Sequence, residues 1–262
     1  MKCVTVFCLT VLAVVFGRVC PTEAIPITNG LIGYWSGDGT SNDLSGQNNH
    51  GTLQNGATFD TGIVDQAFRF NGSSYVEVPD SSFWTFTGDF TIHLWANFQS
   101  LGSGTVFNPE VIFIGHNEGS GATNKWFFAL GGRQLNFHIN RLGPGVFLVK
   151  SSFNPNLNQW YNLAVARSGN TYTIYVDGQV GGSESDSTVI PDANVPLRIG
   201  RNPNEAAFGL NGVMDEVAIY NRALSESEIQ QLAAIPEPST LALFTIATCG
   251  ILGLGYRRRR QA

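Results

Sequence analysis

Short apolar runs follow one another along the chain, broken at frequent intervals by Gly, Asn, Ser, Asp and Pro. Apolar runs of this length, with turn residues at hairpin-like spacing, are typical of antiparallel β-strands. Almost no helical pattern precedes Ser225. The sequence therefore predicts an all-β fold, a two-sheet antiparallel sandwich around one core. We expect strands at Leu31–Ser36, Gln66–Phe70, Ser74–Val78, Phe90–Phe98, Glu110–His116, Lys125–Leu130, Gln134–Asn140, Gly145–Lys150, Trp160–Arg167, Thr171–Val176, Pro196–Ile199 and Leu210–Tyr220.

The stretch Gly209–Leu232 closes this region with the clearest local pattern. Its apolar residues alternate up to Tyr220, as in a strand that is packed on both faces. Ser225 and Glu228 then have the spacing of a capping box, which predicts a short helix. Asp215 lies among the apolar positions of the strand, and burying a bare carboxylate costs roughly several kcal/mol or more. The side chain therefore needs a partner, which could be a metal, a hydrogen bond or a substrate.

The first 24 residues have a different composition from the middle of the chain. They combine one lysine, an apolar run and a small-residue cleavage site, which together predict a secretory signal peptide at 1–24. A buried helix is the alternative interpretation. All four cysteines lie in the two ends of the chain. The predicted sandwich at 27–234 therefore has no disulfide, no zinc-thiolate site and no cysteine nucleophile.

The last 28 residues, 235–262, change composition again. A Pro-Glu-Pro-Ser-Thr motif at 236–240 precedes an apolar run at 241–256 and a basic end at 257–260. As a helix the apolar run is roughly 24 Å long, short but sufficient for a thin bilayer. The basic end predicts a cytoplasmic C-terminus. The sandwich is then expected outside the inner membrane.

The middle of the chain is acidic. Setting aside the six basic and two acidic residues of the two ends, from 15 and 20 in the whole chain, leaves a net charge of −9. An acidic surface argues against nucleic acid and anionic membranes as partners. It is compatible with calcium, a hard cation that takes oxygen ligands.

Short motifs occur in an order that resembles the laminin-G-like domains of the concanavalin A-like jelly-roll family. The resemblance covers Gly30–Ala233 and implies a jelly roll that binds glycans or proteins. Two departures are Asn71, where the family usually has aspartate, and Tyr161, which replaces a common histidine. Trp35, Trp95 and Trp160 match core positions of the family. The motifs are Leu31–Gly39, Asn42–Gly46, Asn49–Thr52, Ala67–Gly72, Tyr75–Pro79, Phe90–Trp95, Trp160–Val165, Ile174–Gly178 and Gly209–Leu232.

The C-terminal segment closely resembles the PEP-CTERM sorting tail of certain Gram-negative bacteria. In that family an exosortase recognises and removes the tail, and the body of the protein reaches the cell surface or extracellular matrix. The resemblance implies an exosortase-type processing enzyme and, transiently, the inner membrane as partners. A plain membrane anchor is the alternative. The matching residues are Pro236, Glu237, Pro238, Arg257, Arg258, Arg259 and Arg260.

An enzyme is one hypothesis for such a sandwich. Retaining glucanases of the superfamily resemble one another in a Glu-x-Asp-x-x-Glu strand, where two carboxylates share one face at roughly 5 Å. Glu184, Ser185 and Asp186 have the first spacing, but no second glutamate follows, and the Gly-rich surroundings indicate a solvated hairpin end. Asp215 and Glu216 are adjacent, so a regular strand points them to opposite faces. We therefore expect no catalytic residues, with a divergent glycoside hydrolase as the lesser alternative.

A module that binds a glycan or an extracellular polymer is the preferred hypothesis. Sugars stack on aromatic rings and are held by polar side chains at the rim of a site. A structural matrix protein without a discrete ligand is the alternative. Aromatic and basic residues that flank the predicted loops are the candidate ligand contacts: Trp84, Trp126, Phe107, Arg141, Phe113, Phe147 and Phe153.

A structural calcium ion is expected where the first and last strands meet, because the resemblance implies one. Asp38, Asp43 and Asp215 match the acidic positions of the opening and closing motifs. Backbone carbonyls could complete a set of oxygen ligands around them. The alternative is that Asp38 and Asp43 cap Gly-rich turns.

Overall fold

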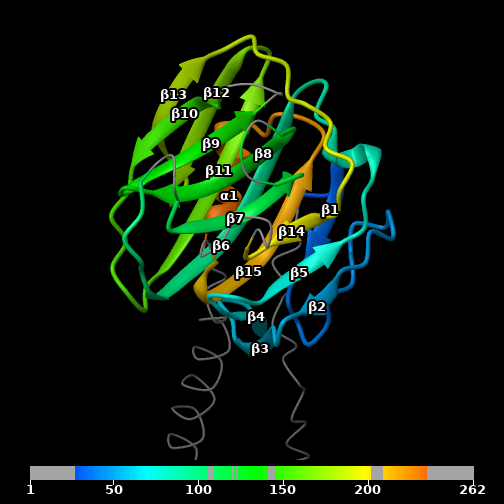
Figure 1. Cartoon of the computed structure of the whole chain (residues 1–262), viewed down its shortest axis with the longest axis vertical. Coiled ribbons are helices and arrows are strands. Elements are labelled where there is room, and N and C mark those ends of the chain that lie inside the picture. Colours follow the sequence, from blue (N-terminus) through cyan, green and yellow to red (C-terminus); the bar gives the residue numbers. More distant parts are fainter. Residues whose placement is uncertain are drawn as a thin grey trace, which may run out of the picture.

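The computed structural model describes residues 27–105, 109–119, 121, 123–140, 145–201 and 209–234, and for Phe147 the backbone only. The predicted signal peptide and sorting tail lie outside these residues. Two antiparallel sheets pack against each other, and a short helix, α1 (Glu226–Ala233), lies on the outside of the larger sheet (Figure 1). The all-β sandwich predicted from the sequence is confirmed. Within the described part of the chain, no helix is both long and apolar enough to cross a membrane.

The larger sheet has eight strands in the order β13-β12-β11-β6-β15-β4-β3, with β1 paired to β15 outside this order. Its strands are β1 (Leu31–Trp35), β3 (Thr58–Thr61), β4 (Gln66–Asn71), β6 (Phe90–Ser100), β11 (Trp160–Ser168), β12 (Thr171–Val176), β13 (Gln179–Ser185) and β15 (Asn211–Tyr220).

The smaller sheet has seven strands in the order β10-β9-β8-β7-β14-β5-β2. A single 3-10 turn, η1 (Ser82–Trp84), connects β5 to β6 and so links the two sheets. The strands of the smaller sheet are β2 (Thr52–Gln54), β5 (Tyr75–Val78), β7 (Val111–Asn117), β8 (Lys125–Gly131), β9 (Gln134–Asn140), β10 (Val146–Ser152) and β14 (Leu197–Ile199).

Three strands, β2, β3 and β13, escape the prediction because their residues are mostly polar or glycine. β13 follows the Asp177-Gly178 turn, whose two residues have φ angles of 50° and 75°, as a type I′ turn requires. Glu184 and Ser185, for which the sequence predicted a solvated hairpin end, are the last two residues of β13, at the edge of the larger sheet. Both side chains are exposed, so the expectation of a solvated position is correct.

β15 organises the larger sheet. It pairs along its length with β6 on one side, and with β4 and then β1 on the other. The predicted regular alternation is wrong, because a β-bulge interrupts the register between Asp215 and Ala218. Glu216 has a φ of 52° at this bulge, a conformation that costs a non-glycine residue energy. Met214, Val217 and Ile219 consequently face the core between the sheets.

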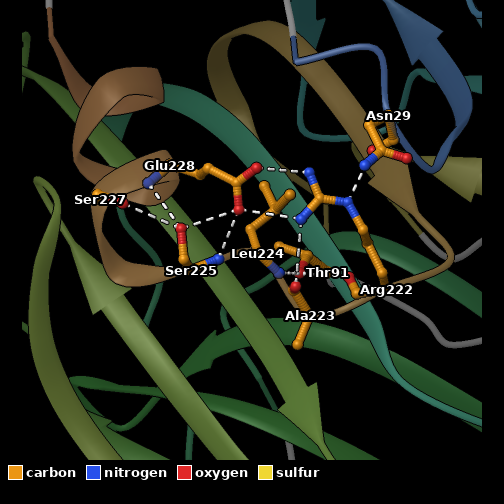
Figure 2. Close-up of polar contacts among 8 residues, drawn as sticks. All are labelled: Asn29, Thr91, Arg222, Ala223, Leu224, Ser225, Ser227 and Glu228. Atoms are coloured by element: carbon orange, nitrogen blue, oxygen red, sulfur yellow. Dashed lines mark hydrogen bonds and ion pairs between the residues drawn. The ribbon is translucent and has the colours of Figure 1, made fainter.

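The capping box predicted for the helix is present. The Ser225 hydroxyl accepts a hydrogen bond from the Glu228 backbone N–H (3.3 Å), and the Glu228 carboxylate accepts one from the Ser225 N–H (2.8 Å). The same carboxylate forms a bidentate ion pair with Arg222, at 2.9 and 2.6 Å (Figure 2). Arg222 also donates to the carbonyl of Asn29, so the start of the helix is tied to the residues before β1.

Candidate functional site

A surface pocket of about 230 Å³ opens beside η1, where the start of β6 meets β1 and the residue that follows β15. We call it the η1 pocket. Its lining combines aromatic, hydroxyl, amide and carboxylate groups, and it comprises Ile32, Ser82, Phe83, Thr85, Phe86, Thr87, Gly88, Asp89 and Asn221.

Two tryptophans predicted as ligand contacts are instead core residues, one within η1 and one in β8. Trp84 and Trp126 are both fully buried. The indole N–H of Trp126 donates to the carbonyl of Trp84 (2.9 Å), and that of Trp84 donates to the carbonyl of Pro79 (3.1 Å). A sugar cannot stack on a ring that is enclosed by the core, so their prediction as direct contacts is wrong. They fix the backbone that presents Phe83 to the pocket.

The polar groups of the η1 pocket lie at its open side. Thr87 and Asn221 are exposed, and Phe83 is half-buried with its ring 6.2 Å from that of Trp84. Asp89 is also exposed, and one of its oxygens accepts a hydrogen bond from the backbone N–H of Gly169 (2.7 Å). The carboxylate is thus held in place. An aromatic surface beside amide and hydroxyl groups is suited to the two faces of a sugar.

Of the remaining predicted ligand contacts, those whose side chains the structure describes do not line this pocket. Phe113 is fully buried and Phe153 is 7% exposed, so both are core residues. Phe107 and Arg141 lie outside the described residues, as does the side chain of Phe147. The sequence did not point to Asn221, which follows β15 and reaches the pocket only because β15 pairs with β1.

The buried carboxylate of Asp215 is satisfied by backbone amides. One oxygen accepts hydrogen bonds from the N–H groups of Ile63 (2.8 Å) and Val64 (3.1 Å), and the other accepts one from Glu216 (2.9 Å). N–H groups that point at both oxygens would repel a cation. Burial is the largest influence on this group and raises the pKa of Asp215 to about 8, against the opposing effect of the amides.

Asp43 and Asp38 also accept hydrogen bonds from backbone amides. Asp43 is 5% exposed and binds the N–H groups of Tyr34 (3.0 Å) and Asn49 (2.9 Å). Asp38 binds the N–H of Gln66 (3.0 Å). Among the described residues, no group of three or more His, Cys, Asp or Glu side chains could hold a metal ion. The three aspartates do not fit the expected calcium site; they organise loops around β1 and β15.

A second polar cluster lies beneath α1, on the outer face of the larger sheet. His93 contacts the carbonyl of Glu216 through one ring nitrogen (3.2 Å) and the side-chain amide of Asn162 through the other (2.7 Å). The same amide donates to the carbonyl of Leu232 in the helix (3.1 Å), while Tyr34 donates to the Glu216 carboxylate (2.8 Å). Burial lowers the pKa of His93 to about 4, so its ring is neutral. This cluster fastens the helix to the sheet.

Comparison with known protein families gives two matches. A family model of the concanavalin A-like lectin/glucanase superfamily, of the laminin-G type, matches residues 70–230. The chain belongs to this superfamily. The sandwich of this concanavalin A-like protein begins before residue 70, because β1 and β3 are part of the larger sheet. No curated protein sequence matches the chain.

The second family match is the PEP-CTERM protein-sorting motif, at residues 234–260. This confirms the sorting tail predicted from Pro236 to Arg260. The motif directs export, with the protein destined for the cell surface or the extracellular space. The matched segment begins at the last described residue of the domain, immediately after α1.

Solved structures share the fold at low sequence identity. Domain 4 of AbnA, an extracellular arabinanase from Geobacillus stearothermophilus in complex with arabinotriose, has a TM-score of 0.64 and 18% identity, over 78% of this chain and 98% of that one. The binding domain of Paraclostridial Mosquitocidal Protein 1 has a TM-score of 0.61 and 21% identity, over 79% and 52%. The binding domain of botulinum neurotoxin DC, in complex with SialylT, has 0.63 and 15%, over 81% and 53%. The chain spans about half of each toxin binding domain.

Proposed function

We propose that this concanavalin A-like protein is an exported, non-catalytic module that binds a neutral glycan or a related extracellular polymer in the η1 pocket. The observation that carries the proposal is the lining of this pocket, where the ring of Phe83 lies beside the exposed side chains of Thr87, Asn221 and Asp89. Structural neighbours with a bound arabinotriose or SialylT support a binding role for the fold.

The size and charge of the pocket restrict its ligand. Its volume of about 230 Å³ is below the roughly 300–1,000 Å³ typical of drug-sized ligands, which favours one or two sugar units of a chain. Its described lining contains one carboxylate, Asp89, and no cationic side chain. A neutral sugar therefore fits better than an acidic one.

Binding is a better account of the pocket than glycoside hydrolysis. Both retaining and inverting glycosidases use a pair of carboxyl groups at the scissile bond. Asp89 carries the one carboxylate among the described lining residues, and one of its oxygens accepts a hydrogen bond from a backbone amide. A divergent glycoside hydrolase, which would need a second carboxylate in the pocket, is therefore the lesser candidate.

A matrix protein without a saturable ligand is the other alternative, and binding of oligosaccharides separates the two. We would apply the full chain in detergent to an array of neutral oligosaccharides that includes arabinotriose. The expected result is saturable binding to a subset of the array, weakened roughly fivefold by Asn221→Ala, as the loss of one hydrogen bond of about 1 kcal/mol predicts. Asn42→Ala, an exposed asparagine outside the pocket, is the matched control. A blank array would favour the matrix hypothesis.

A further inference from the structure

The end of the sandwich where the sorting tail begins carries exposed apolar side chains. Leu157 is 49% exposed in the turn before β11, and Trp160, the first residue of that strand, is half-buried. The family resemblance predicted Trp160 as a core residue, but among the described residues it belongs to none of the buried hydrophobic clusters. It is the only one of the five tryptophans that is not buried.

The direction of α1 brings the chain out at this end. The residue before its cap, Leu224, is bonded to Thr91 at the start of β6, whereas Leu232 in its last turn is bonded to Asn162 in β11. Asn162 lies opposite Trp95, and Trp160 lies opposite Asn97, two residues further along β6. The helix therefore points along β6 towards Trp160, and away from the η1 pocket at the other end of that strand.

The sequence limits how far the domain can lie from a membrane that holds the apolar run at 241–256. The apolar run that follows the Pro-Glu-Pro motif begins at Leu241, eight residues beyond the last helical residue, Ala233. Even a fully extended chain of this length spans at most about 29 Å. A tether this short keeps the end of the domain at a high effective concentration near the bilayer surface.

We infer that, before the tail is removed, Leu157 and Trp160 rest in the headgroup layer of the membrane and orient the η1 pocket away from it. Tryptophan is suited to this layer because its ring is apolar and its N–H polar. The middle of the chain carries a net charge of −9, so the contact is apolar and does not depend on anionic lipid. The inference rests on the sorting part of the proposed function and is independent of glycan binding.

Tryptophan fluorescence of the full chain in zwitterionic vesicles tests this orientation. Lipids that carry bromine near the headgroup quench the fluorescence of a tryptophan in that layer. The fluorescence of the four buried tryptophans should not be affected. We expect quenching in the wild type, none in Trp160→Phe, and weaker quenching in Leu157→Ser. Trp95→Phe, which removes a buried ring from the same sheet, should leave the quenching unchanged.

Several results would overturn the inference. The first is wild-type emission that headgroup bromines leave unchanged, and the second is quenching that persists in Trp160→Phe. The third is an oligomeric chain that shows no quenching, which would mean that self-association buries Trp160. Failure of the full chain to float with vesicles would also overturn it, together with the membrane step of sorting. None of these results would affect binding on the oligosaccharide array, so the two proposals fail separately.

Discussion

Asp215 shows how single polar residues are accommodated inside this sandwich. Its carboxylate is fully buried, yet its oxygens accept hydrogen bonds from three backbone N–H groups, two of them in the loop before β4. Burial nevertheless raises its pKa from 3.8 to about 8. The folded protein therefore binds a proton at Asp215 that the unfolded chain does not, at every pH between these two values.

This proton makes stability depend on pH in a predictable direction. The contribution of Asp215 is complete below about pH 4 and is lost as the pH rises towards 8. His93 acts oppositely, because burial lowers its pKa from 6.5 to about 4, so its contribution is complete above 6.5. Between pH 6.5 and 8 only the first effect remains. We expect the free energy of unfolding, measured with denaturant, to fall by about 1–2 kcal/mol over this interval.

Asp215→Asn tests the assignment. The variant should lose this pH dependence, and should be destabilised by about 1–3 kcal/mol because its NH2 group would face backbone donors. Asp60→Asn, at an exposed position on β3, should keep the slope of the wild type. A slope that persists in Asp215→Asn would show that another group titrates.

At the scale of elements, α1 is held at both of its ends by polar contacts. The Arg222–Glu228 ion pair and the capping box fix its first turn, and Asn162 fixes its last turn through the carbonyl of Leu232. Between them, Ile229 is fully buried against the outer face of the larger sheet. An eight-residue helix is too short to be stable alone, so its stability depends on these contacts.

Removing the bond at the end of the helix should loosen α1. Asn162→Ala leaves the Leu232 carbonyl and a ring nitrogen of His93 without their partner, which is expected to cost about 1–3 kcal/mol. Hydrogen exchange in Glu226–Ala233 should accelerate more than in β8, which is remote from the helix. Equal acceleration in both elements would indicate global destabilisation and contradict a local role.

Removing the charge at the start of the helix should have a smaller effect. The Arg222 guanidinium lowers the pKa of Glu228 to about 2 by hydrogen bonding, but both side chains are partly exposed. We expect Glu228→Gln to lower the free energy of unfolding by about 1 kcal/mol or less at neutral pH. Glu226→Gln, in the same turn but outside the ion pair, is the control. Equal losses in the two variants would show that the helix dipole, and not the ion pair, accounts for the effect.

At the scale of the whole molecule, the fold could be predicted and the site could not. The positions of most strands along the chain follow from short apolar runs and turn residues, which are local signals. The η1 pocket combines Ile32, Phe83 and Asn221, which only the pairing of β1 with β15 and the turn of η1 bring together. Trp84 was a candidate ligand contact because it flanks a predicted loop, and nothing local showed that its ring is buried against Trp35.

The same limit applies to the expected calcium ion. The sequence showed that Asp215 needs a partner but gave no sign that the amides of Ile63 and Val64 would supply it, since these residues are about 150 positions away. Glu216 is similar: its left-handed backbone depends on the bulge, which depends on the register with β6. Side-chain partners that are set by register lie beyond local pattern analysis.

The central claim is that a neutral glycan binds at the end of the sandwich that holds η1. NMR spectra of the 15N-labelled full chain, titrated with an oligosaccharide from the array, test it most directly, because the side-chain amide of Asn221 gives its own signal. The account predicts shifts of this amide and of the backbone amides of Phe83 and Thr87. Saturable shifts confined to the smaller sheet, around the stacked rings of Phe127 in β8 and His138 in β9, with the η1 pocket unchanged, would contradict it.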